Sequence, residues 1–319
     1  MRGVIRARRA LDVRGRIVVV MGGSRGLGLV LARELVKRGA QVAICARDKE
    51  ELDRARRDLV EKGGDVFASV CDVTDRDSVI QFVTQVEDDV GPIDVLINNA
   101  GIIQCGPVEN MTCRDFEDAL DVNLRGPLHA MLSVIPYMKK RGEGRVVNIA
   151  SIGGKIAVPH LAPYSTSKFA LVGLSEAMRS ELVKDGIYVT TVCPGLMRTG
   201  SPRHAWFKGQ AQKEYAWFSS ADSFVLSSIS AETAAVQIVD AMQNGDPEIT
   251  ISWQGKLAAF VNGIAPTLVQ EIMSVVARAL PGPTSSQAKV EGKDAESKWA
   301  PSILTRNSDE AATANNERD

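Results

Sequence analysis

Tyr164 and Lys168 are the residues of this sequence whose types and spacing most directly suggest chemistry. They stand four positions apart in a helical pattern, which places both side chains on one face of a helix. A free tyrosine has a pKa of about 10, so it exchanges its proton near neutral pH only beside a cation such as Lys168. Ser151 ends a predicted strand, where its hydroxyl can hydrogen-bond a carbonyl oxygen. Such a set suits hydride transfer to a ketone, because the alkoxide that forms must receive a proton.

Each of these residues also has an ordinary structural explanation. A Tyr and a Lys four residues apart on a helix are most often an exposed pair, and a serine after a strand most often caps the next helix. His160, between Ser151 and Tyr164, could assist proton transfer, but a loop histidine that shapes a pocket is the more frequent case. The joint occurrence of the set favours an enzyme, and we assign His160 no catalytic role.

A glycine-rich turn follows the first predicted strand. Residues 22–28 read Gly-Gly-Ser-Arg-Gly-Leu-Gly, with Gly22, Gly26 and Gly28 spaced as GxxxGxG. Glycine permits a tight turn, and the helix that begins here directs its free N–H groups and positive dipole end at a pyrophosphate. A glycine cluster alone is weak evidence. Its position in a strand, turn, helix, strand unit makes dinucleotide binding the favoured interpretation.

The end of the second predicted strand bears on which dinucleotide is bound. In dinucleotide folds, an acidic residue at this place binds the ribose 2′-hydroxyl of NAD. Ala46 and Arg47 occupy it here, and Arg47, joined by Arg25 of the glycine turn, could pair with a 2′-phosphate. Asp48 is close, but residues 48–51 have the form of a capping box that opens the next helix. The sequence therefore favours NADP(H), with NAD(H) as the alternative.

A frame of strands and helices must bring these residues together. From Arg16 onward, short apolar runs alternate with helical patterns, which is typical of βαβ units and a parallel sheet. The runs are continuously apolar, as in strands that are buried on both faces. Seven strands are predicted, at Ile17–Met21, Gln41–Ala46, Val66–Cys71, Val95–Asn98, Arg145–Ile149, Ile187–Val192 and Glu248–Ile251. The predicted fold class is α/β, a doubly wound Rossmann sheet of seven parallel strands in a single domain with a C-terminal helical extension.

Together these motifs resemble the short-chain dehydrogenase/reductase family, in its single-domain branch, over approximately residues 15–253. The resemblance is carried by the glycine turn, Asp72-Val73, Asn98-Asn99-Ala100-Gly101, Asn123, Ser151, Tyr164, Lys168, Pro194-Gly195 and Thr199. It implies that Asn123, Ser151, Tyr164 and Lys168 form the catalytic set, with Asn123 holding a water that links Lys168 to solvent. It also implies that Asp72 faces the adenine, that residues 98–101 line the cofactor and that Thr199 contacts the nicotinamide carboxamide.

The glycine turn, Arg47 and the resemblance together define a predicted cofactor site. Its residues are Gly22, Ser24, Arg25, Gly26, Leu27, Gly28, Arg47, Asp72, Val73, Asn99, Ala100, Gly101, Tyr164, Lys168, Pro194, Gly195 and Thr199. One departure is Met21, which stands where the family usually has a threonine whose hydroxyl braces the turn. One lost hydrogen bond costs about 1 kcal/mol, so we expect altered cofactor affinity at most.

The bulk composition limits the class of partner. Of 319 residues, 45% are hydrophobic and 24% are charged, which is typical of a soluble globular protein with a sizeable core. A net charge of −1 gives no field to attract nucleic acid or an anionic membrane. The five cysteines form no CxxC pair and no metal-ligand spacing, as expected of reduced thiols in a cytoplasmic protein. Residues 1–14 form a basic arm, which we interpret as a solvated tail rather than a transit peptide or a membrane-surface arm.

The stretch of residues 198–230 carries most of the information on the substrate. It gathers aromatic residues in a chain otherwise poor in them, namely Trp206, Phe207, Tyr215, Trp217, Phe218 and Phe224. We expect either a mobile apolar lid over a hydrophobic substrate, with Ile152, His160 and Leu196 at the pocket wall, or rings packed in a core or subunit contact. The accompanying Arg198, Arg203, His204, Lys208 and Lys213 could bind an anionic group, but a solvated helix face is the more frequent case.

The chain continues well beyond the last predicted strand. Apolar residues recur at helical spacing in residues 254–281, interrupted by Pro266, and predict two added amphipathic helices. These could cover the site, form an oligomer contact or rest on a membrane, and burial against protein is the default. Residues 282–319 contain few apolar residues and are predicted to be disordered.

The sequence is therefore interpreted as an NADP(H)-dependent oxidoreductase that acts on a small, apolar ketone or alcohol. We expect a cytoplasmic enzyme and, from the resemblance, a homodimer or homotetramer, with no metal, no nucleic-acid partner and no favoured membrane contact. The alternatives are a catalytically silent NADP(H)-binding sensor, an NAD-dependent alcohol dehydrogenase and a two-lobed sugar epimerase or dehydratase. The last of these usually has a substantial substrate lobe, which is not evident here.

Overall fold

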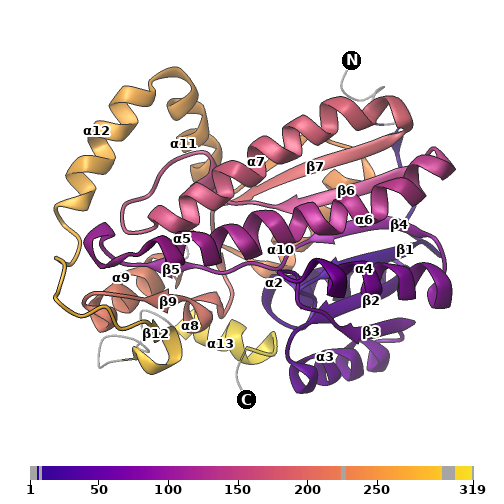
Figure 1. Cartoon of the computed structure of the whole chain (residues 1–319), viewed down its shortest axis with the longest axis horizontal. Coiled ribbons are helices and arrows are strands. Elements are labelled where there is room, and N and C mark those ends of the chain that lie inside the picture. The colour runs from indigo at the N-terminus through magenta and orange to yellow at the C-terminus, as the bar shows by residue number, and fades with distance from the viewer. Residues whose placement is uncertain (1–5, 7–8, 224–227, 297–305, 318–319) are drawn as a thin grey trace.

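A seven-stranded parallel sheet forms the centre of the computed structural model, which describes residues 6, 9–223, 228–296 and 306–317 (Figure 1). Its strands are β1 (Ile17–Met21), β2 (Gln41–Ala46), β3 (Val66–Val70), β4 (Ile93–Asn98), β6 (Gly144–Ile149), β7 (Ile187–Pro194) and β11 (Glu248–Ile251). They lie in the order β11-β7-β6-β4-β1-β2-β3. The predicted seven-stranded Rossmann sheet is confirmed, and its strand order reverses between β1 and β4, where ligands bind in such folds.

Helices cover both faces of this sheet because successive strand residues point to opposite sides. Val18 and Val20 of β1 pack with α2 (Gly26–Lys37), α3 (Lys49–Glu61) and α10 (Ala231–Gln243). Val19 and Met21 pack with α4 (Arg76–Gln85), α6 (Gly126–Arg141) and the end of α7 (Ala162–Leu182). The two apolar layers hold the carboxyl ends of β1, β4 and β6 side by side.

Shorter elements surround that edge of the sheet. β5 (Gln104–Cys105), β9 (Trp206–Phe207) and β12 (Val290–Glu291) form one small sheet, and β8 (Leu196–Arg198) pairs with β10 (Ser228–Ser230). The accompanying helices are α5 (Cys113–Leu120), α8 (Ser201–His204) and α9 (Ala211–Ser223). This group of elements contains most of the stretch that the sequence singled out for its aromatic residues.

Three of those aromatic rings are packed in a core. Phe207, Tyr215 and Phe218 are buried, and the Phe207 ring meets the other two edge-on at centroid distances of 5.5 and 6.0 Å. For these three rings the packing expectation is confirmed and the mobile lid is not, while Phe224 lies outside the described residues. Lys208, expected on a solvated face, is instead buried in an ion pair with Asp115 at 2.6 Å, and its N–H donates to the Cys105 carbonyl.

The two added helices are present as α11 (Trp253–Ile264) and α12 (Pro266–Ala277). They project from the body of the chain as a hairpin (Figure 1). Among the described residues, burial against protein, the default expectation, is not found for Trp253, Phe260 and Ile264, which are 68%, 65% and 68% exposed. Among the described residues, no helix combines the length and the apolar character needed to cross a membrane.

Residues 9–14 of the basic arm pack against the body of the chain. Leu11 and Val13 are buried in the core beside α2 and α10, and the Leu11 N–H donates to the Gln243 carbonyl at 2.9 Å. Arg6 forms an ion pair with Asp246. The solvated-tail interpretation is therefore wrong for these residues, because two apolar side chains among the arginines are enough to dock the arm.

The prediction of disorder is wrong for residues 282–296 and 306–317. β12 pairs with β9, and the Asn110 side chain donates to the carbonyls of Thr284 and Ser286, both at 2.8 Å. α13 (Arg306–Ala314) packs on α9 and β8, and Asn315, which follows it, accepts from the Gly26 N–H of the glycine turn. A segment poor in apolar residues cannot build a core of its own, but it can bond to polar groups that an existing fold already offers.

Candidate active site

Ser151 and Tyr164 meet at the carboxyl end of β6. Ser151 follows this strand and caps the 3-10 turn Ile152–Gly154, its Oγ accepting from the Gly153 N–H at 3.0 Å. Tyr164 lies in the first turn of α7. A methyl group built on Gly153 would lie 3.2 Å from Cε1 of Tyr164 and 3.4 Å from Oγ of Ser151. The Ser151 hydroxyl and an edge of the Tyr164 ring therefore both lie within 3.4 Å of one point.

Lys168 lies one turn after Tyr164 on α7. Its Nζ is 5.7 Å from the centroid of the Tyr164 ring and donates to the Ile149 carbonyl at 2.8 Å. Burial lowers the pKa of the Lys168 ammonium to about 8, because the charged form loses its hydration. The predicted helix face thus carries a lysine that titrates close to physiological pH, which an exposed surface pair would not provide.

Asn123 completes the group from a different element. It lies in the π-helical turn Asp121–Arg125 between α5 and α6, and such turns are frequent at functional sites. The Asn123 side chain exchanges hydrogen bonds with the backbone of Ile102, both at 3.0 Å, and donates to Ser167 Oγ at 2.9 Å. A methyl group on Gly101 would be 3.1 Å from Asn123 Oδ1 and 3.6 Å from Lys168 Nζ. All four residues of the predicted catalytic set are thus brought together.

The glycine turn is interlocked with the loop that follows β4. Gly22 has a φ of +76°, and a methyl group on it would lie 2.8 Å from the Cα of Ala100. A methyl group on Gly28 would collide with the Gly22 carbonyl, which already accepts from Asn99 Nδ2 at 2.8 Å. Side chains at Gly22 and Gly28 would push the turn away from residues 99–100, so glycine is required for this close approach.

The start of α2 fits the pyrophosphate of a dinucleotide. Arg25 is the N-cap residue, but its side chain makes no capping hydrogen bond. The N–H groups in the first turn of α2 therefore have no N-cap side chain as an acceptor. The N–H of Gly26 donates to the backbone carbonyl of Asn315. Uncapped donors beside glycines that permit close approach are the arrangement that binds phosphate.

The adenosine side of the site contains an acid whose role the sequence did not suggest. Asp48 caps α3 as predicted, its Oδ1 accepting from the Glu51 N–H at 2.9 Å. The Glu51 carboxylate, expected to complete the capping box, instead accepts from Ser24 Oγ and pairs with Arg25 Nη1 at 2.7 Å. α2 and β2 separate Ser24 from Glu51 in the sequence, and no local motif signals their contact. Arg47 is exposed at the end of β2.

The remaining predicted cofactor residues lie along the same edge of the sheet. Asp72 accepts from the N–H and hydroxyl of Thr74 at 2.9 and 2.8 Å, and Val73 is buried beneath it. Pro194 ends β7, and the Gly195 N–H donates to the Ile251 carbonyl at 3.2 Å. Thr199 is buried, with its hydroxyl accepting from the Ser201 N–H at 3.2 Å.

His160, expected at the pocket wall, is turned toward α9. Its Nδ1 lies 2.9 Å from Oε1 of Glu214, whose carboxylate is fully buried and also accepts from Trp217 Nε1 at 2.7 Å. His160 has a φ of +63°, an unusual conformation for a residue other than glycine. Through Glu214, His160 joins the loop before α7 to α9.

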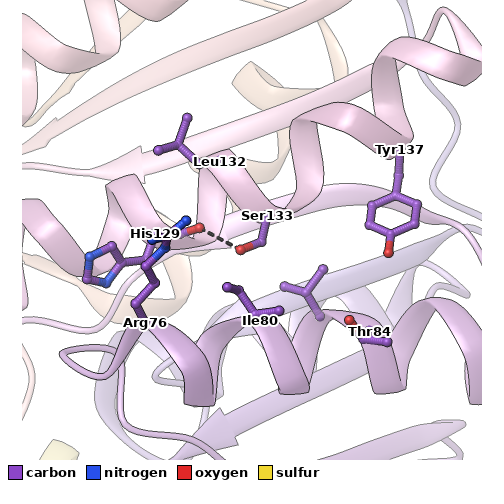
Figure 2. A pocket seen from close by; sticks show the side chains of 8 residues that line it. Arg76, Ile80, Thr84, His129, Leu132, Ser133 and Tyr137 are labelled. Atoms are coloured by element: carbon purple, nitrogen blue, oxygen red, sulfur yellow. Dashed lines mark hydrogen bonds between the residues drawn. The ribbon is translucent and has the colours of Figure 1, made fainter.

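A shallow pocket of about 140 Å³ lies elsewhere, between α4 and α6 (Figure 2). Its lining includes Ile80, Leu132 and Tyr137, with Arg76 and His129 at one end. None of the four residues of the predicted catalytic set takes part in it. Among the described residues, no cluster of three or more His, Cys, Asp or Glu side chains could hold a metal ion.

Comparison with known proteins agrees with this geometry. The family model for short chain dehydrogenases matches residues 16–206. The chain is 37% identical over 185 residues to gluconate 5-dehydrogenase of Gluconobacter oxydans, which covers 58% of this chain and 72% of that protein. It is 30% identical over 282 residues to a fatty acyl-CoA reductase of Acinetobacter baylyi, which covers 88% of this chain and 90% of that protein.

Solved structures show the same likeness. An actinorhodin polyketide ketoreductase solved with NADPH is 30% identical and superimposes with a TM-score of 0.67 over 74% of this chain and 95% of its own. A short-chain dehydrogenase from Streptomyces avermitilis is 28% identical, with a TM-score of 0.69 over 83% of this chain and 99% of its own. The chain belongs to the short-chain dehydrogenase/reductase family. It is an oxidoreductase of the class that acts on CH–OH and C=O groups with a nicotinamide cofactor.

Proposed function

We propose that this protein is an NADP(H)-dependent oxidoreductase that transfers a hydride between the nicotinamide and an apolar ketone or secondary alcohol. The observation that carries this proposal is that Ser151 Oγ and an edge of the Tyr164 ring both lie within 3.4 Å of the position of a methyl group on Gly153, with Lys168 Nζ 5.7 Å from the centroid of that ring. Three groups that can bind, protonate and electrostatically support a carbonyl oxygen thus converge on a single edge of the sheet.

The four side chains divide the proton chemistry among them. The bound nicotinamide supplies or accepts the hydride. The Ser151 hydroxyl hydrogen-bonds the substrate oxygen, and the Tyr164 phenol gives that oxygen a proton during reduction or accepts one during oxidation. The Lys168 ammonium stabilises the phenolate that remains on Tyr164. Asn123, buried beside Gly101 and Lys168, orders the path by which the proton is replaced.

The choice of NADP(H) rests on the end of β2. Ala46 and the exposed Arg47 stand where NAD-binding members of dinucleotide folds place an acid. Arg47 can form charge-assisted hydrogen bonds with a 2′-phosphate, and the absence of an acid at this position removes the repulsion that would oppose it. Because Arg25 is already paired with Glu51, we assign the 2′-phosphate to Arg47 alone.

An apolar substrate is supported by the surroundings of the strand edge. α11 lies directly against the loop after Ser151, where Asn262 Nδ2 donates to the Lys155 carbonyl at 2.9 Å. The same helix carries an exposed apolar stripe, formed by Trp253, Leu257 and Phe260. The relative named fatty acyl-CoA reductase, which spans this helical extension, fits a substrate with an apolar chain.

We also propose a cytoplasmic homo-oligomer, for which the exposed Leu132 of α6 and Phe169 of α7 provide apolar contact area.

The cofactor assignment is tested by measuring the dissociation constants of NADPH and NADH through tryptophan fluorescence. We expect NADPH to be preferred, and Arg47→Ala to weaken its binding by about 10- to 100-fold without changing that of NADH, since hydrogen bonds to a charged group contribute about 1.5–3 kcal/mol. Lys49→Ala, which removes an exposed cation two residues away, is the matched control. A preference for NADH would overturn the assignment to NADP(H), and binding of neither dinucleotide would overturn the enzymatic proposal.

A further inference from the structure

The C-terminal segment, residues 306–317, ends against the glycine turn, while its helix α13 packs on α9 and β8. The Gly26 N–H donates to the Asn315 carbonyl at 2.9 Å, and Asn316 Nδ2 donates to the carbonyls of Ser24 and Glu51 at 2.9 and 3.0 Å. Asn315 is only 1% exposed. Its side-chain Oδ1 accepts from Arg33, whereas its Nδ2 has no hydrogen-bond partner among the described residues.

Glu317 extends this contact along the site. Its carboxylate lies against both Gly26 and Gly200, where a methyl group on either glycine would collide with it. Ala312 also packs on Gly200, 2.6 Å from the position of a methyl group there, and the Glu317 carbonyl lies 3.2 Å from His204 Nε2. Glu317 is 6% exposed. The C-terminal segment therefore spans the distance from the phosphate turn to the residue that follows Thr199.

The Glu317 carboxylate lies at the start of α2, where a phosphate of the cofactor would be expected to bind. The positive end of the helix dipole and the uncapped N–H groups of α2 favour an anion there. The Asn315 carbonyl uses one of those N–H groups, and the Glu317 carboxylate supplies the negative charge. A pyrophosphate needs the same donors and the same space, so the two cannot be bound together.

We propose that the C-terminal segment is an intramolecular competitor of NADP(H), which must displace residues 312–317 from the glycine turn in order to bind. This inference rests on the function proposed above, because it takes the glycine turn as the pyrophosphate site. The segment acts as a built-in inhibitor whose release opens the cofactor site.

The chain provides anchors for this segment that lie outside the glycine turn. Arg33 of α2 donates to Asn315 Oδ1 at 2.9 Å and to the Ala314 carbonyl at 3.0 Å. Arg54 of α3 donates to Asn316 Oδ1 at 2.9 Å. Asn316 has a φ of +59°, a conformation that asparagine adopts more readily than most residues. These hydrogen bonds hold the segment in one position on α2 and α3, which an unspecific attraction between charges would not do.

The expected change in NADPH affinity follows from the fraction of molecules in which the segment covers the cofactor site. A segment that covers the site about 90% of the time weakens the apparent affinity for NADPH about tenfold. Tethering makes such occupancy attainable with modest contacts, because a short linker gives an effective concentration of about millimolar.

The test compares full-length variants that differ only within the segment. Ala312→Glu places a charge at a fully buried position against Gly200 and should dislodge the segment, whereas Ala314→Ser changes an exposed side chain and serves as the control. We expect Ala312→Glu to bind NADPH about tenfold more tightly than the native chain and Ala314→Ser to bind like it. Hydrogen exchange provides a second readout, in which saturating NADPH should speed the exchange of the backbone amides of residues 310–317 in the native chain.

A synthetic peptide of residues 306–319 distinguishes competition from a change in folding. Added to Ala312→Glu, the peptide should raise the apparent dissociation constant of NADPH in proportion to its concentration. Equal NADPH affinity in the native chain and Ala312→Glu, with amide exchange in residues 310–317 unchanged by NADPH, would overturn the proposal. Weaker binding by a folded Ala312→Glu would show that the segment supports the cofactor instead. Absence of NADPH and NADH binding in every variant would refute the proposed function, which is a separate outcome.

Discussion

The two ends of the candidate site are completed by different parts of the chain. At the reacting end, formed by Asn123, Ser151, Tyr164 and Lys168, each contact joins elements of the central fold. At the phosphate end, formed by residues 22–28, the Gly26 N–H and the carbonyl of Ser24 are bonded to residues near the C-terminus, about 290 positions away in sequence.

This difference assigns separate supports to the two ends, as the proposed competition requires. The reacting end is rigid because its side chains are held by backbone groups of the sheet and of α7. The phosphate end is held by a segment joined to the fold mainly through polar contacts, and such contacts exchange readily for those of a charged ligand. Substitutions at the reacting end should therefore alter the rate of chemistry, and substitutions around the C-terminal segment should alter cofactor affinity.

The largest effect is expected at the reacting end. Tyr164→Phe removes the proton donor while keeping the ring, so kcat should fall by about 10²- to 10⁴-fold, the usual contribution of a general acid. The measurement is the turnover of NADPH with an apolar ketone. Tyr137→Phe, on the partly exposed face of α6, is the matched control and should keep native turnover. A Tyr164→Phe variant that retains more than a tenth of the native kcat would remove Tyr164 from the reaction.

Lys168 should impose a pH-dependent cost on stability. Its pKa is lowered in the folded chain to about 8, so between pH 8 and 10.5 the unfolded state binds more protons and native stability rises with pH. Lys168→Met removes the buried charge and should be more stable than the native chain at pH 7, by up to about 3 kcal/mol, with most of this gap gone at pH 10. It should also be inactive.

Urea unfolding at pH 7 and pH 10 measures this gap. Lys213→Met removes an exposed lysine and should show no pH-dependent difference from the native chain. A gap that stays constant between the two pH values would mean that Lys168 is not a charged, desolvated group at neutral pH.

The sequence predicts the elements that place the side chains of the reacting end, because that information is local. Tyr164 and Lys168 share one helix, and the strand ends that place Ser151 and residues 98–101 follow from continuous apolar runs. The contact between Glu51 and Ser24 was not predicted, because it joins two helical starts across a strand and competes with the capping role of the same residue.

Composition was a poor guide in the C-terminal region. The apolar α11 and α12 were expected to be buried, yet Phe260 and Ile264 are mostly exposed. The polar residues 306–317 were expected to be disordered, yet Asn315 and Glu317 are buried. Apolar content indicates whether a segment can form its own core, but not whether another part of the fold offers it hydrogen-bond partners.

The smallest effect concerns the anchor of the C-terminal segment at the phosphate end. Arg33→Met removes two hydrogen bonds to Asn315 and Ala314 without touching the glycine turn, so the segment should bind its seat less tightly by about 1 kcal/mol. NADPH affinity, measured by fluorescence titration, should then increase about fourfold, because a segment that covers the site about 90% of the time would cover it only about 60% of the time. Lys37→Met removes a cation from the next turn of α2, where the side chain is 79% exposed, and should leave the affinity unchanged. An equal increase in both variants would indicate a general effect of charge, and no increase in either would show that the two ends of the site are not separately controlled.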